Sequence, residues 1–406
     1  MGLISSRSAV APLRRSLRSE VRLPTVEALV AAERPAEPVL CLRPAVITAG
    51  AEAFVAGFPG TVLYAVKCNP EPAVLRALWA GGVRHFDCAS AAEVALVRSL
   101  FPEAAIHFMH PVKSRAAIRE AWERQDVRDF VLDDASELAK ILAETGAGAA
   151  DGLGLVVRIA PPPGGGALYD LSGKFGAGLE EAVALLRAAR PHAARLGISF
   201  HVGSQCMDPL AYRRAIALAG QAIRMAGVAV EVIDVGGGFP VAYPEIEPLP
   251  LGAYFAEIEA AFEALGLPQA ELWAEPGRAL AAAGGSVVVQ VQMRRGGMLY
   301  VNDGVYGSLS DAGAPGFRFP ARLLRPEGGA PPVLRGFSFY GPTCDSADIM
   351  RGPFELPEDV REGDWIEIGQ LGAYGACLRT GFNGFDRARL AEVADAVVPE
   401  ALPQAA

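Results

Sequence analysis

The feature that most restricts how this 406-residue chain can fold is a regular alternation of segments between about residue 60 and residue 280. Short runs rich in β-branched residues predict strands, and a segment of helical composition follows each of the first seven. Eight strands are expected, at residues 61–67, 83–90, 105–110, 129–134, 154–160, 197–205, 230–239 and 271–278. Eight such units predict a (β/α)8 TIM barrel; a doubly wound open sheet, which rarely has so many evenly spaced units, is the alternative.

The chain changes character beyond residue 285, where strand-like runs are separated by Gly, Pro and Asp turns and by little helix. This pattern predicts an antiparallel β domain, and residues 38–42 are expected to add one strand to it from before the barrel. We therefore expect a basic N-terminal segment, a barrel domain and a β domain made of two pieces. Their ranges are 1–21, 45–280, and 22–44 with 281–406.

The composition excludes several classes of partner. The net charge of −9 and the isoelectric point near 5.3 argue against nucleic acid or an anionic membrane and favour a small metabolite. No apolar stretch is long enough to span a bilayer. The six cysteines are scattered, with no CxxC pair and no histidine at metal-ligand spacing, so neither a disulfide framework nor a metal site is expected.

The N-terminal segment is rich in Arg and Ser and has no acid before Glu20, a composition that resembles an organelle transit peptide. It has no clear amphipathic periodicity, so we interpret it as a basic tail. The scattered cysteines of an acidic chain indicate a reducing compartment, and we expect a cytoplasmic protein.

Function in a TIM barrel gathers at the carboxyl ends of its strands. Here every predicted strand ends in an ionisable residue or in glycine, which an ordinary surface would not require. In chain order these residues are Lys67, Asp87, His110, Asp133, Arg158, His201, Gly236–Gly238 and Glu275. We therefore expect the functional site at this end of the barrel.

Lys67 stops the apolar run of TVLYAVKCNP, residues 61–70. The residue alone leaves two interpretations open: a strand-end lysine that reaches solvent, or an amine in an apolar pocket that can form a Schiff base. The three glycines of DVGGGFP, residues 234–240, are either a simple turn or a nest of backbone N–H groups for a phosphate. This loop lacks the Lys-Ser/Thr of a nucleotide P-loop, which favours a small phosphorylated cofactor over ATP.

Glu275 and Arg278 lie in AEPGR, residues 274–278, either as a surface ion pair or as a carboxylate and a cation at the barrel mouth. His201 and Ser204 end the sixth predicted strand, where a single histidine is more often a core residue than a catalyst. Taken together, a Schiff-base lysine, a phosphate nest and a carboxylate that keeps a pyridine nitrogen protonated are what pyridoxal phosphate requires.

With these residues in place, the sequence resembles the fold-type III pyridoxal-phosphate decarboxylases of basic amino acids, of the eukaryotic-type ornithine decarboxylase group. The stretches that carry the resemblance run in order from residue 64 to residue 375: YAVKCNP, FDCAS, FHVGSQ, DVGGGFP, EPGR, NDGVYGS, GPTCDSAD and GAYG. The resemblance implies a (β/α)8 barrel of the alanine-racemase type, a C-terminal antiparallel β-sandwich or barrel domain, and decarboxylation of L-ornithine to putrescine and CO2.

The resemblance also implies a role for each matching residue. Lys67 would form the Schiff base with the cofactor, Asp87 would position it, His201 would stack on the pyridine ring, and Glu275 would pair with the ring nitrogen. Arg158 would lie near Lys67 and the ring's phenolic oxygen. The phosphate would be surrounded by Ser204, Gly237, Gly238, Gly277, Arg278 and Tyr374.

The stretch GPTCDSAD, residues 341–348, discriminates between members of the family. The bland interpretation makes Cys344 a small buried residue and Asp345 a turn residue. In the family, the cysteine enters the active site of the neighbouring subunit and protonates the substrate's α-carbon, and the aspartate binds the distal amine. Diaminopimelate decarboxylases carry Glu in place of Asp345. The resemblance thus implies a diamine-forming homodimer with active sites shared across its interface.

One departure from the family pattern affects the substrate. After NDGVYGS, better-known members continue to a Tyr-Asp whose acid also binds the distal amine, whereas this chain has the shorter LSDAGAPGF. Asp311 could take that role, and Ser310 then replaces the aromatic neighbour and enlarges the pocket. Ornithine or lysine is therefore open as the substrate, since one methylene discriminates only about 10- to 200-fold.

Other enzymes on the same scaffold stay as alternatives: an arginine or carboxynorspermidine decarboxylase, or, least favoured, an amino-acid racemase. A non-catalytic regulatory relative is a further alternative, although such proteins tend to lose cofactor residues.

The loop 161–176, with Lys174 near its end, is long and Gly- and Pro-rich and is expected to be a lid over the site.

Overall fold

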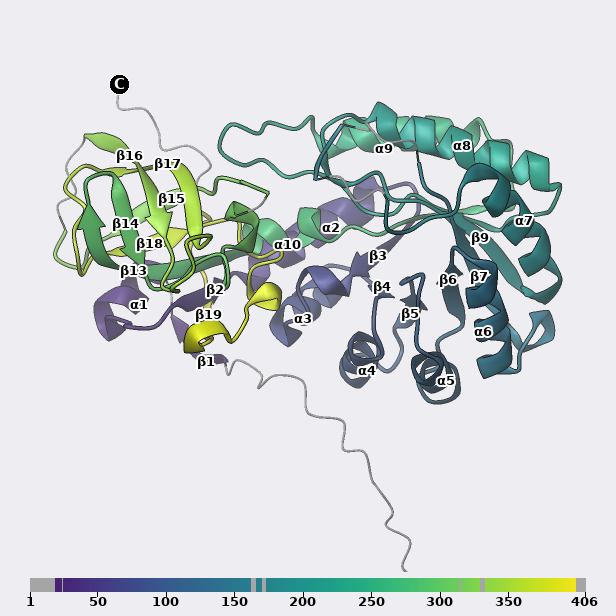
Figure 1. Cartoon of the computed structure of the whole chain (residues 1–406), viewed down its shortest axis with the longest axis horizontal. Helices are drawn as coiled ribbons and strands as arrows, with labels where there is room; N and C mark the ends of the chain where they lie inside the picture. The colour runs from purple at the N-terminus through teal and green to yellow at the C-terminus, as the bar shows by residue number, and fades with distance from the viewer. Residues whose placement is uncertain are drawn as a thin grey trace, which may run out of the picture.

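The computed structural model describes residues 19–23, 25–161, 166–169, 173–313, 315–328 and 333–398. Most of the basic N-terminal segment and parts of the expected lid therefore lie outside the described residues. The described chain forms a barrel wrapped by helices and, beside it, a domain built mainly of strands, with α2 and α10 between the two (Figure 1). The open-sheet alternative is excluded because the barrel strands close on themselves.

The barrel consists of eight parallel strands in the order β11-β12-β3-β4-β5-β6-β7-β9. The strands are β3 Thr61–Ala65, β4 His85–Cys88, β5 Ala105–Phe108, β6 Asp129–Leu132, β7 Gly154–Arg158, β9 Arg195–Ser199, β11 Val232–Asp234 and β12 Glu271–Ala274. Seven of the predicted strands contain one of them and the predicted run 197–205 overlaps β9, so the predicted (β/α)8 barrel is confirmed. A small antiparallel pair, β8 Ala167–Tyr169 and β10 Ser204–Cys206, was not predicted.

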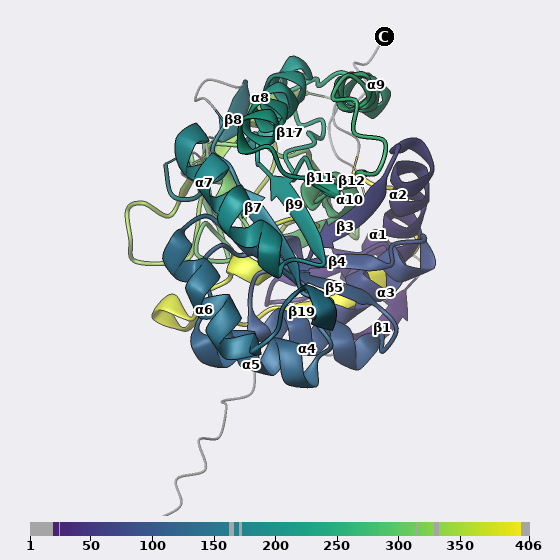
Figure 2. The same ribbon diagram turned by 90° about the vertical axis from the view of Figure 1, so that its right-hand side faces the viewer.

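A helix follows each of the first seven barrel strands, as predicted, and these helices surround the barrel (Figure 2). They are α3 Pro72–Ala80, α4 Ala91–Leu100, α5 Arg115–Arg124, α6 Ala135–Thr145, α7 Leu179–Ala189, α8 Leu210–Ala226 and α9 Leu251–Glu263; α2 Pro44–Gly57 precedes the barrel and α10 Arg278–Ala281 follows it. Their starts are encoded locally. The side chains of Ser90, Ser114 and Asp134 cap α4, α5 and α6 by accepting first-turn backbone N–H groups.

The strands are shorter than the predicted runs, and this difference places the functional residues. Strand β3 stops at Ala65, and Lys67 lies in the single 3-10 turn η1, Val66–Cys68. Strand β9 stops at Ser199, before His201. A side chain beyond the last ladder hydrogen bond no longer follows the in-out alternation of the strand, and so it can face the mouth of the barrel.

The outward side chains of the barrel strands pack against the helices and form the main apolar core. The interior holds smaller apolar clusters, one of Leu63, Val232 and Trp273 and one of Met109, Val131 and Val156. At the amino-terminal end, an ion pair closes the interior: Arg195 binds Asp129, and His107 Nδ1 lies 2.9 Å from the Asp129 carboxylate. These clusters and the ion pair therefore fill the interior and close its amino-terminal end.

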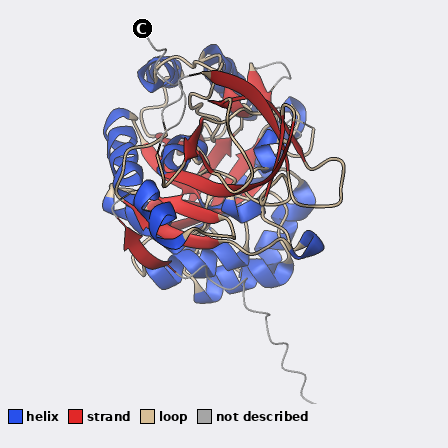
Figure 3. Cartoon of the chain, turned by 90° about the vertical axis from the view of Figure 1, so that its left-hand side faces the viewer, coloured by secondary structure: helices blue, strands red, loops and turns tan. Residues whose placement is uncertain are grey.

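The second domain is a nine-stranded sheet with the path β1-β19-β2-β13-β14-β16-β17, and β18 joins β13 to β15. Figure 3 views the molecule from this domain. Its elements are β1 Ser19–Leu23, α1 Val26–Glu33, β2 Val39–Leu42, β13 Gly285–Arg295, β14 Met298–Val301, β15 Ala321–Leu324, β16 Leu334–Tyr340, β17 Ile349–Pro357, β18 Trp365–Ile368 and β19 Arg389–Val393. The early strand predicted at 38–42 is confirmed as β2, which pairs antiparallel with β13.

The sheet is mostly antiparallel, as predicted, but three pairs are parallel: β1 with β19, β2 with β19, and β14 with β16. The parallel pairs join segments that are distant in sequence, because β19 returns from near the C-terminus to lie beside β2. Strand patterns identify runs of extended chain, but they do not give the partner or direction of a strand that arrives from far away.

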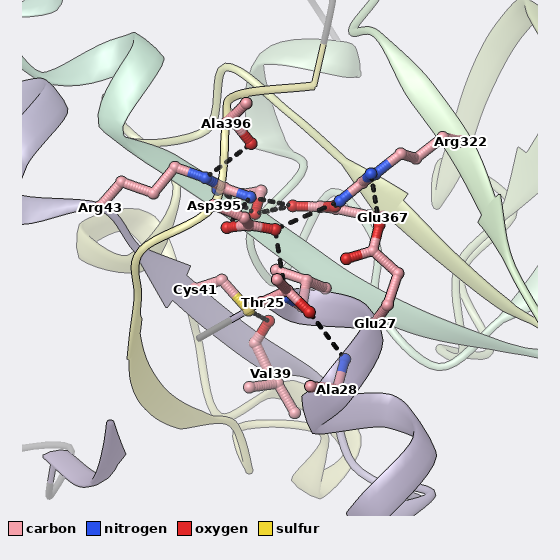
Figure 4. Close-up of polar contacts among 12 residues, drawn as sticks. Thr25, Glu27, Ala28, Val39, Cys41, Arg43, Arg322, Glu367, Asp395 and Ala396 are labelled. Carbon is pink, nitrogen blue, oxygen red and sulfur yellow. Dashed lines mark hydrogen bonds and ion pairs between the residues drawn. The ribbon is translucent and has the colours of Figure 1, made fainter. Parts of the chain in front are cut away.

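A buried ionic network fastens the start of α2 to the β domain (Figure 4). The guanidinium of Arg43, which is 2% exposed, lies 2.7 Å from Glu367, 3.0 Å from Asp395 and 2.9 Å from the Ser286 hydroxyl. Arg322 binds Glu367 from the other side. Because a buried charge is costly without a partner, this network holds the barrel and the sheet in a fixed relation.

Three further features concern membranes, metal ions and cysteines. Among the described residues no helix is long and apolar enough to cross a membrane. The same residues contain no group of His, Cys, Asp and Glu side chains that could hold a metal ion. The six cysteines all lie within the described residues and form no disulfide, and Cys344 is exposed.

Candidate active site

Lys67 and Asp87 form the centre of the site at the carboxyl-terminal end of the barrel. Lys67 Nζ lies 2.5 Å from Asp87 Oδ2, and the two side chains are 40% and 1% exposed. The second carboxylate oxygen of Asp87 is buried and has no hydrogen-bond partner in the described structure. The lysine side chain is therefore accessible to a ligand, and the buried aspartate fixes its position.

The charge of Lys67 is set by its surroundings. Burial alone would lower its pKa, but the carboxylates of Asp87 and then Glu275 raise it overall. Lys67 is therefore an ammonium group, and a reaction at its amine begins with loss of a proton. Asp87 is the adjacent acceptor for that proton.

Glu275 and Asp234 form a pair of buried acids beside Lys67. Burial, and then the charges of Asp234 and Asp87, raise the pKa of Glu275 well above its ordinary value. Burial also raises the pKa of Asp234 to about 6, and a hydrogen bond with Glu275 connects the two carboxyls. Two buried acids in contact cannot both ionise easily. A cationic ring N–H beside Glu275 would satisfy this carboxylate, which fits a protonated pyridine nitrogen.

His201 is held as a neutral ring. Its Nδ1 accepts a hydrogen bond from the Gly203 N–H at 3.0 Å, so the other ring nitrogen, Nε2, carries the hydrogen. Burial, with the charges of Arg158 and Lys67, lowers the pKa of His201 to about 3. The Arg158 guanidinium itself lies 5.8 Å from the centre of the Phe175 ring. A neutral, flat imidazole can stack on an aromatic ring without adding charge to the site.

The glycine loop after β11 presents backbone N–H groups. The carbonyl oxygens of Gly237 and Gly238 accept hydrogen bonds from the Tyr212 hydroxyl and the Cys206 N–H, whereas the N–H groups of these two glycines donate none among the described residues. Gly236 and Gly238 have φ of 67° and 101°, which side chains rarely tolerate. A Cβ on Gly237 would lie 2.7 Å from the Glu275 carbonyl oxygen and 3.1 Å from His201 Nε2. Bare backbone is therefore required here, as in an anion nest.

Arg278 supplies the cation of the loop after β12. Its Nη2 lies 3.5 Å from the Ser204 hydroxyl, and the Tyr374 ring centre lies 4.9 Å from its guanidinium carbon. Tyr374 comes from the β domain, and its backbone N–H donates to the Cys68 carbonyl next to Lys67. A Cβ on Gly277 would lie 2.9 Å from the Cys68 Cβ. The site thus lies where the two domains meet.

These features fit one cofactor. Free backbone N–H groups, Arg278 and Ser204 suit a phosphate; His201 suits an aromatic ring; Glu275 suits a ring nitrogen; and Lys67 suits an aldehyde. The structure brings together on the barrel mouth the residues predicted for the cofactor: Lys67, Asp87, Arg158, His201, Ser204, Gly237, Gly238, Glu275, Gly277, Arg278 and Tyr374.

A family model described as "Pyridoxal-dependent decarboxylase, pyridoxal binding domain" matches residues 45–282, which is more than half of the chain. The chain belongs to this family. Pyridoxal phosphate is accordingly its cofactor, in agreement with the chemistry of the barrel mouth. The resemblance read from the motifs is confirmed at the level of the family.

The relatives of this chain match over most of their length. A lysine/ornithine decarboxylase of Selenomonas ruminantium is 34% identical over 335 residues, covering 80% of this chain and 81% of the relative. An ornithine decarboxylase of Panagrellus redivivus is 34% identical over 350 residues, covering 80% and 78%. The structure of a lysine/ornithine decarboxylase from Vibrio vulnificus complexed with putrescine has a TM-score of 0.77 at 32% identity, covering 91% of this chain and 99% of that one.

Other matching proteins are named for different substrates or functions. The structure of an arginine decarboxylase from Paramecium bursaria Chlorella virus bound to agmatine has a TM-score of 0.78 at 29% identity, covering 90% of this chain and 99% of that one. An antizyme inhibitor 2 of Xenopus laevis is 32% identical over 355 residues, covering 80% and 74%. The chain is thus a member of the basic amino acid decarboxylase family, and these names do not fix one substrate for it.

Cys344 and Asp345, predicted to act on the substrate, lie in the loop between β16 and β17 of the β domain. Cys344 is exposed, and its backbone N–H donates to Asn383 Oδ1 at 3.0 Å. Asp345 accepts from the Ala347 N–H and from the Tyr306 hydroxyl, and these bonds lower its pKa. No hydrogen bond or ion pair among the described residues joins this loop to Lys67.

Asp311, predicted to bind the distal amine of the substrate, lies in the 3-10 turn η5, Ser310–Ala312, where it makes an ion pair with Arg278 at 2.8 Å. Its role at the substrate is still a prediction, and the ion pair with Arg278 offers a different role.

Sequence reasoning missed Asp234 and Tyr243. The alternation along β11 could have placed Asp234 inside the barrel. Tyr243 lies in an irregular loop and gives no signal in the sequence.

Proposed function

We propose that this protein decarboxylates L-ornithine to putrescine and CO2 and that it works as a homodimer. The observation that carries the proposal is the acidic Asp345 beside Cys344 on one fixed loop. An aspartate held as an anion suits a substrate with a cationic far end, whereas a distal carboxylate would be repelled. A diamine-forming reaction therefore fits better than one on an acidic substrate.

The cofactor residues are proposed to act as their contacts suggest. Pyridoxal phosphate, when bound, would supply an electron sink for the bonding pair that stays on the α-carbon as CO2 leaves. Glu275 keeps a positive ring nitrogen beside it, and His201 covers the ring face without adding charge. Asp87 takes and returns the proton of Lys67, and Arg158 adds a cation near the same centre. The free N–H groups of the glycine loop, with Arg278, orient the phosphate.

Cys344 is proposed to protonate the α-carbon of the substrate in the active site of a second copy. Its thiol is exposed, and its loop is fixed by the Asn383 side chain and by the bonds at Asp345. The described structure offers no bond that ties this loop to Lys67 of the same chain. A second copy would bring the two together and exclude water from the mouth, so the dimer would be required for activity.

L-lysine is the second candidate substrate. Ser310 replaces an aromatic residue of better-known relatives, and a smaller side chain leaves room for one more methylene. A matching relative from Selenomonas ruminantium carries both amino acids in its name. A non-catalytic role, as in relatives named antizyme inhibitor, is supported less well because Lys67, Glu275, Arg278 and Cys344 are all retained.

A competition assay tests the proposal. Purified protein with pyridoxal phosphate receives equimolar L-ornithine, L-lysine and L-arginine, and mass spectrometry identifies the amines formed. Putrescine as the main product is expected. Mainly cadaverine would replace ornithine by lysine and keep the mechanism. Cofactor binding without any amine product would refute the substrate class, and Lys67→Ala, run in parallel, should give no product.

A lid over the site remains part of the proposal. Phe175, near the end of the loop 161–176, lies at 5.2 Å from His110 and 5.0 Å from Lys174 Nζ, measured from its ring centre. The Gly176 N–H donates to Asp133, the residue after β6, at 2.8 Å. The end of this loop is thus anchored at the barrel mouth, where it could cover a bound substrate.

A further inference from the structure

Asp311 and Arg278 form a nearly buried ion pair at the junction of the two domains. Asp311 Oδ2 lies 2.8 Å from Arg278 Nη1, and the two side chains are 14% and 8% exposed. The backbone of Asp311 is also fixed, because its carbonyl oxygen accepts a hydrogen bond from the Phe317 N–H at 2.9 Å. The carboxylate is therefore held against the arginine from a rigid turn.

The two terminal nitrogens of Arg278 have different partners. Nη1 binds both Asp311 and the Tyr243 hydroxyl, the latter at 3.0 Å. Nη2 reaches the Ser204 hydroxyl, which belongs to the expected phosphate nest. The guanidinium carbon lies 5.2 Å from the centre of the Phe317 ring and 4.9 Å from that of Tyr374. One edge of the guanidinium is thus anchored, and the other faces the nest.

Asp345 has a different environment. It lies on an exposed loop, it binds neutral donors, and among the described residues it has no cationic partner. Its negative charge is available to an ammonium ion. The charge of Asp311, in contrast, is compensated by a guanidinium in contact with it, so that an approaching ammonium would meet a nearly neutral pair.

We propose that Asp311 is a positioning residue of the phosphate site rather than a ligand of the substrate's distal amine. It holds the Nη1 edge of Arg278 so that the Nη2 edge faces the phosphate, and it cancels part of the charge of the arginine. The phosphate is therefore bound less tightly than the free charge of Arg278 would allow.

A consequence for the substrate follows, and it rests on the proposed function. With Asp311 bound to Arg278, Asp345 of a second copy is the acidic group assigned to the distal amine. A single half-buried carboxylate fixes the far end of the substrate loosely. We therefore expect ornithine and lysine both to be substrates, with kcat/KM values that differ by less than about 100-fold.

The test compares two ligands that differ only in the phosphate. Full-length protein freed of cofactor is titrated with pyridoxal phosphate and with pyridoxal, and the ratio of their affinities isolates the phosphate contribution. In Asp311→Asn the amide oxygen can still accept from Nη1, but the negative charge is gone. The ratio should then rise about three- to tenfold in favour of pyridoxal phosphate. Asp345→Asn, the same change at the other aspartate, should leave the ratio unchanged.

Substrate kinetics separates the two roles of Asp311. The positioning role predicts that Asp311→Asn changes the KM for ornithine by less than about twofold, whereas Asp345→Asn raises it more than about tenfold. A ratio that stays constant or falls in Asp311→Asn overturns the proposal. A rise of more than about tenfold in KM overturns it as well and restores Asp311 to the substrate.

A second variant keeps the proposal testable if Asp311→Asn does not fold. Tyr243→Phe removes the hydroxyl that anchors the same nitrogen and changes no charge, so the ratio of affinities should fall several-fold; an unchanged ratio would contradict the anchored edge. These titrations contain no amino acid. They therefore succeed or fail independently of whether ornithine is the substrate.

Discussion

At the scale of single residues, the most consequential feature is the pair of acids at the ends of β11 and β12. Asp234 is fully buried, and its Oδ1 accepts from the Gly236 N–H at 2.8 Å. Apart from the Glu275 carboxyl, its Oδ2 has no partner among the described residues, so protonation of either acid would join the two. Since Glu275 is the residue proposed to face the ring nitrogen, Asp234 decides how easily that residue ionises.

This pair predicts a pH dependence of folding stability. The pKa of Asp234 rises from an ordinary value of 3.8 to about 6 in the folded chain, so the folded state binds more protons than the unfolded state between these values. The contribution of Asp234 to stability is therefore complete below pH 3.8 and is lost as the pH rises through about 6. Denaturant unfolding of cofactor-free protein between pH 4.5 and pH 7 measures this loss of stability.

The variant Asp234→Asn is the comparison. Its amide does not titrate, so the stability of the wild-type protein relative to the variant should decline as the pH rises over this range. Lys140→Ala, which alters an ion pair on α6, is a control that should track the wild-type curve. A difference between wild type and Asp234→Asn that stays constant with pH would show that Asp234 is not protonated.

At the scale of elements, the turn after β11 is the piece on which cofactor binding depends. Gly237→Ala should lower the affinity for pyridoxal phosphate by more than about tenfold, because the new methyl group crowds the Glu275 carbonyl and the His201 ring. Equilibrium dialysis with pyridoxal phosphate measures the loss, and circular dichroism reports whether the fold is kept.

A matched substitution separates the nest from a general effect of replacing glycine. A Cβ on Gly252, in the first turn of α9, would meet nothing within 4 Å. Gly252→Ala should therefore leave the affinity for the cofactor unchanged and slightly stabilise the helix. Equal affinities in the two variants would argue against a phosphate at this turn.

At the scale of the whole molecule, the proposed active site needs both domains and a second copy. Lys67→Ala would disable the cofactor end of a site, and Cys344→Ala would disable the loop that enters from the partner. When the two variants, each deficient in forming the amine product, are mixed, half of the dimers should be hybrids with one intact site each. About a quarter of the wild-type activity should return if subunits exchange freely.

The arrangement of sites determines the outcome of this mixing experiment. Sites made within one chain would give no recovery, because every chain would carry one defect in its own site. Mixing each variant with itself is the control and should give only the residual activity of that variant. Cys344→Ala alone should also form an aldehyde by-product from wrong protonation, and a clean amine product would contradict the role of the thiol.

Local sequence was sufficient for much of the fold. Runs of β-branched residues, alternating with segments of helical composition, predicted every barrel strand, and the residues after those strands gave the candidate site. This worked because the carboxyl ends of parallel strands converge in any closed barrel. The early strand at 38–42 was recognised by the same local signal. The individual roles of the site residues remain predictions that the experiments above address.

Other features depended on contacts between distant segments. The parallel placement of β19 beside β2, the Arg43 network and the pairing of Asp311 with Arg278 join residues that no local pattern relates. Asp311 is the clearest case: the resemblance to the family assigned it to the substrate, whereas its contact with Arg278 carries the proposal made above. What the sequence by itself determined was the barrel, the cofactor and the chemical types at the strand ends, because these follow from periodicity and residue type. Only the tertiary structure decided which charged side chains form ion pairs, because an ion pair depends on the distance between two groups in space.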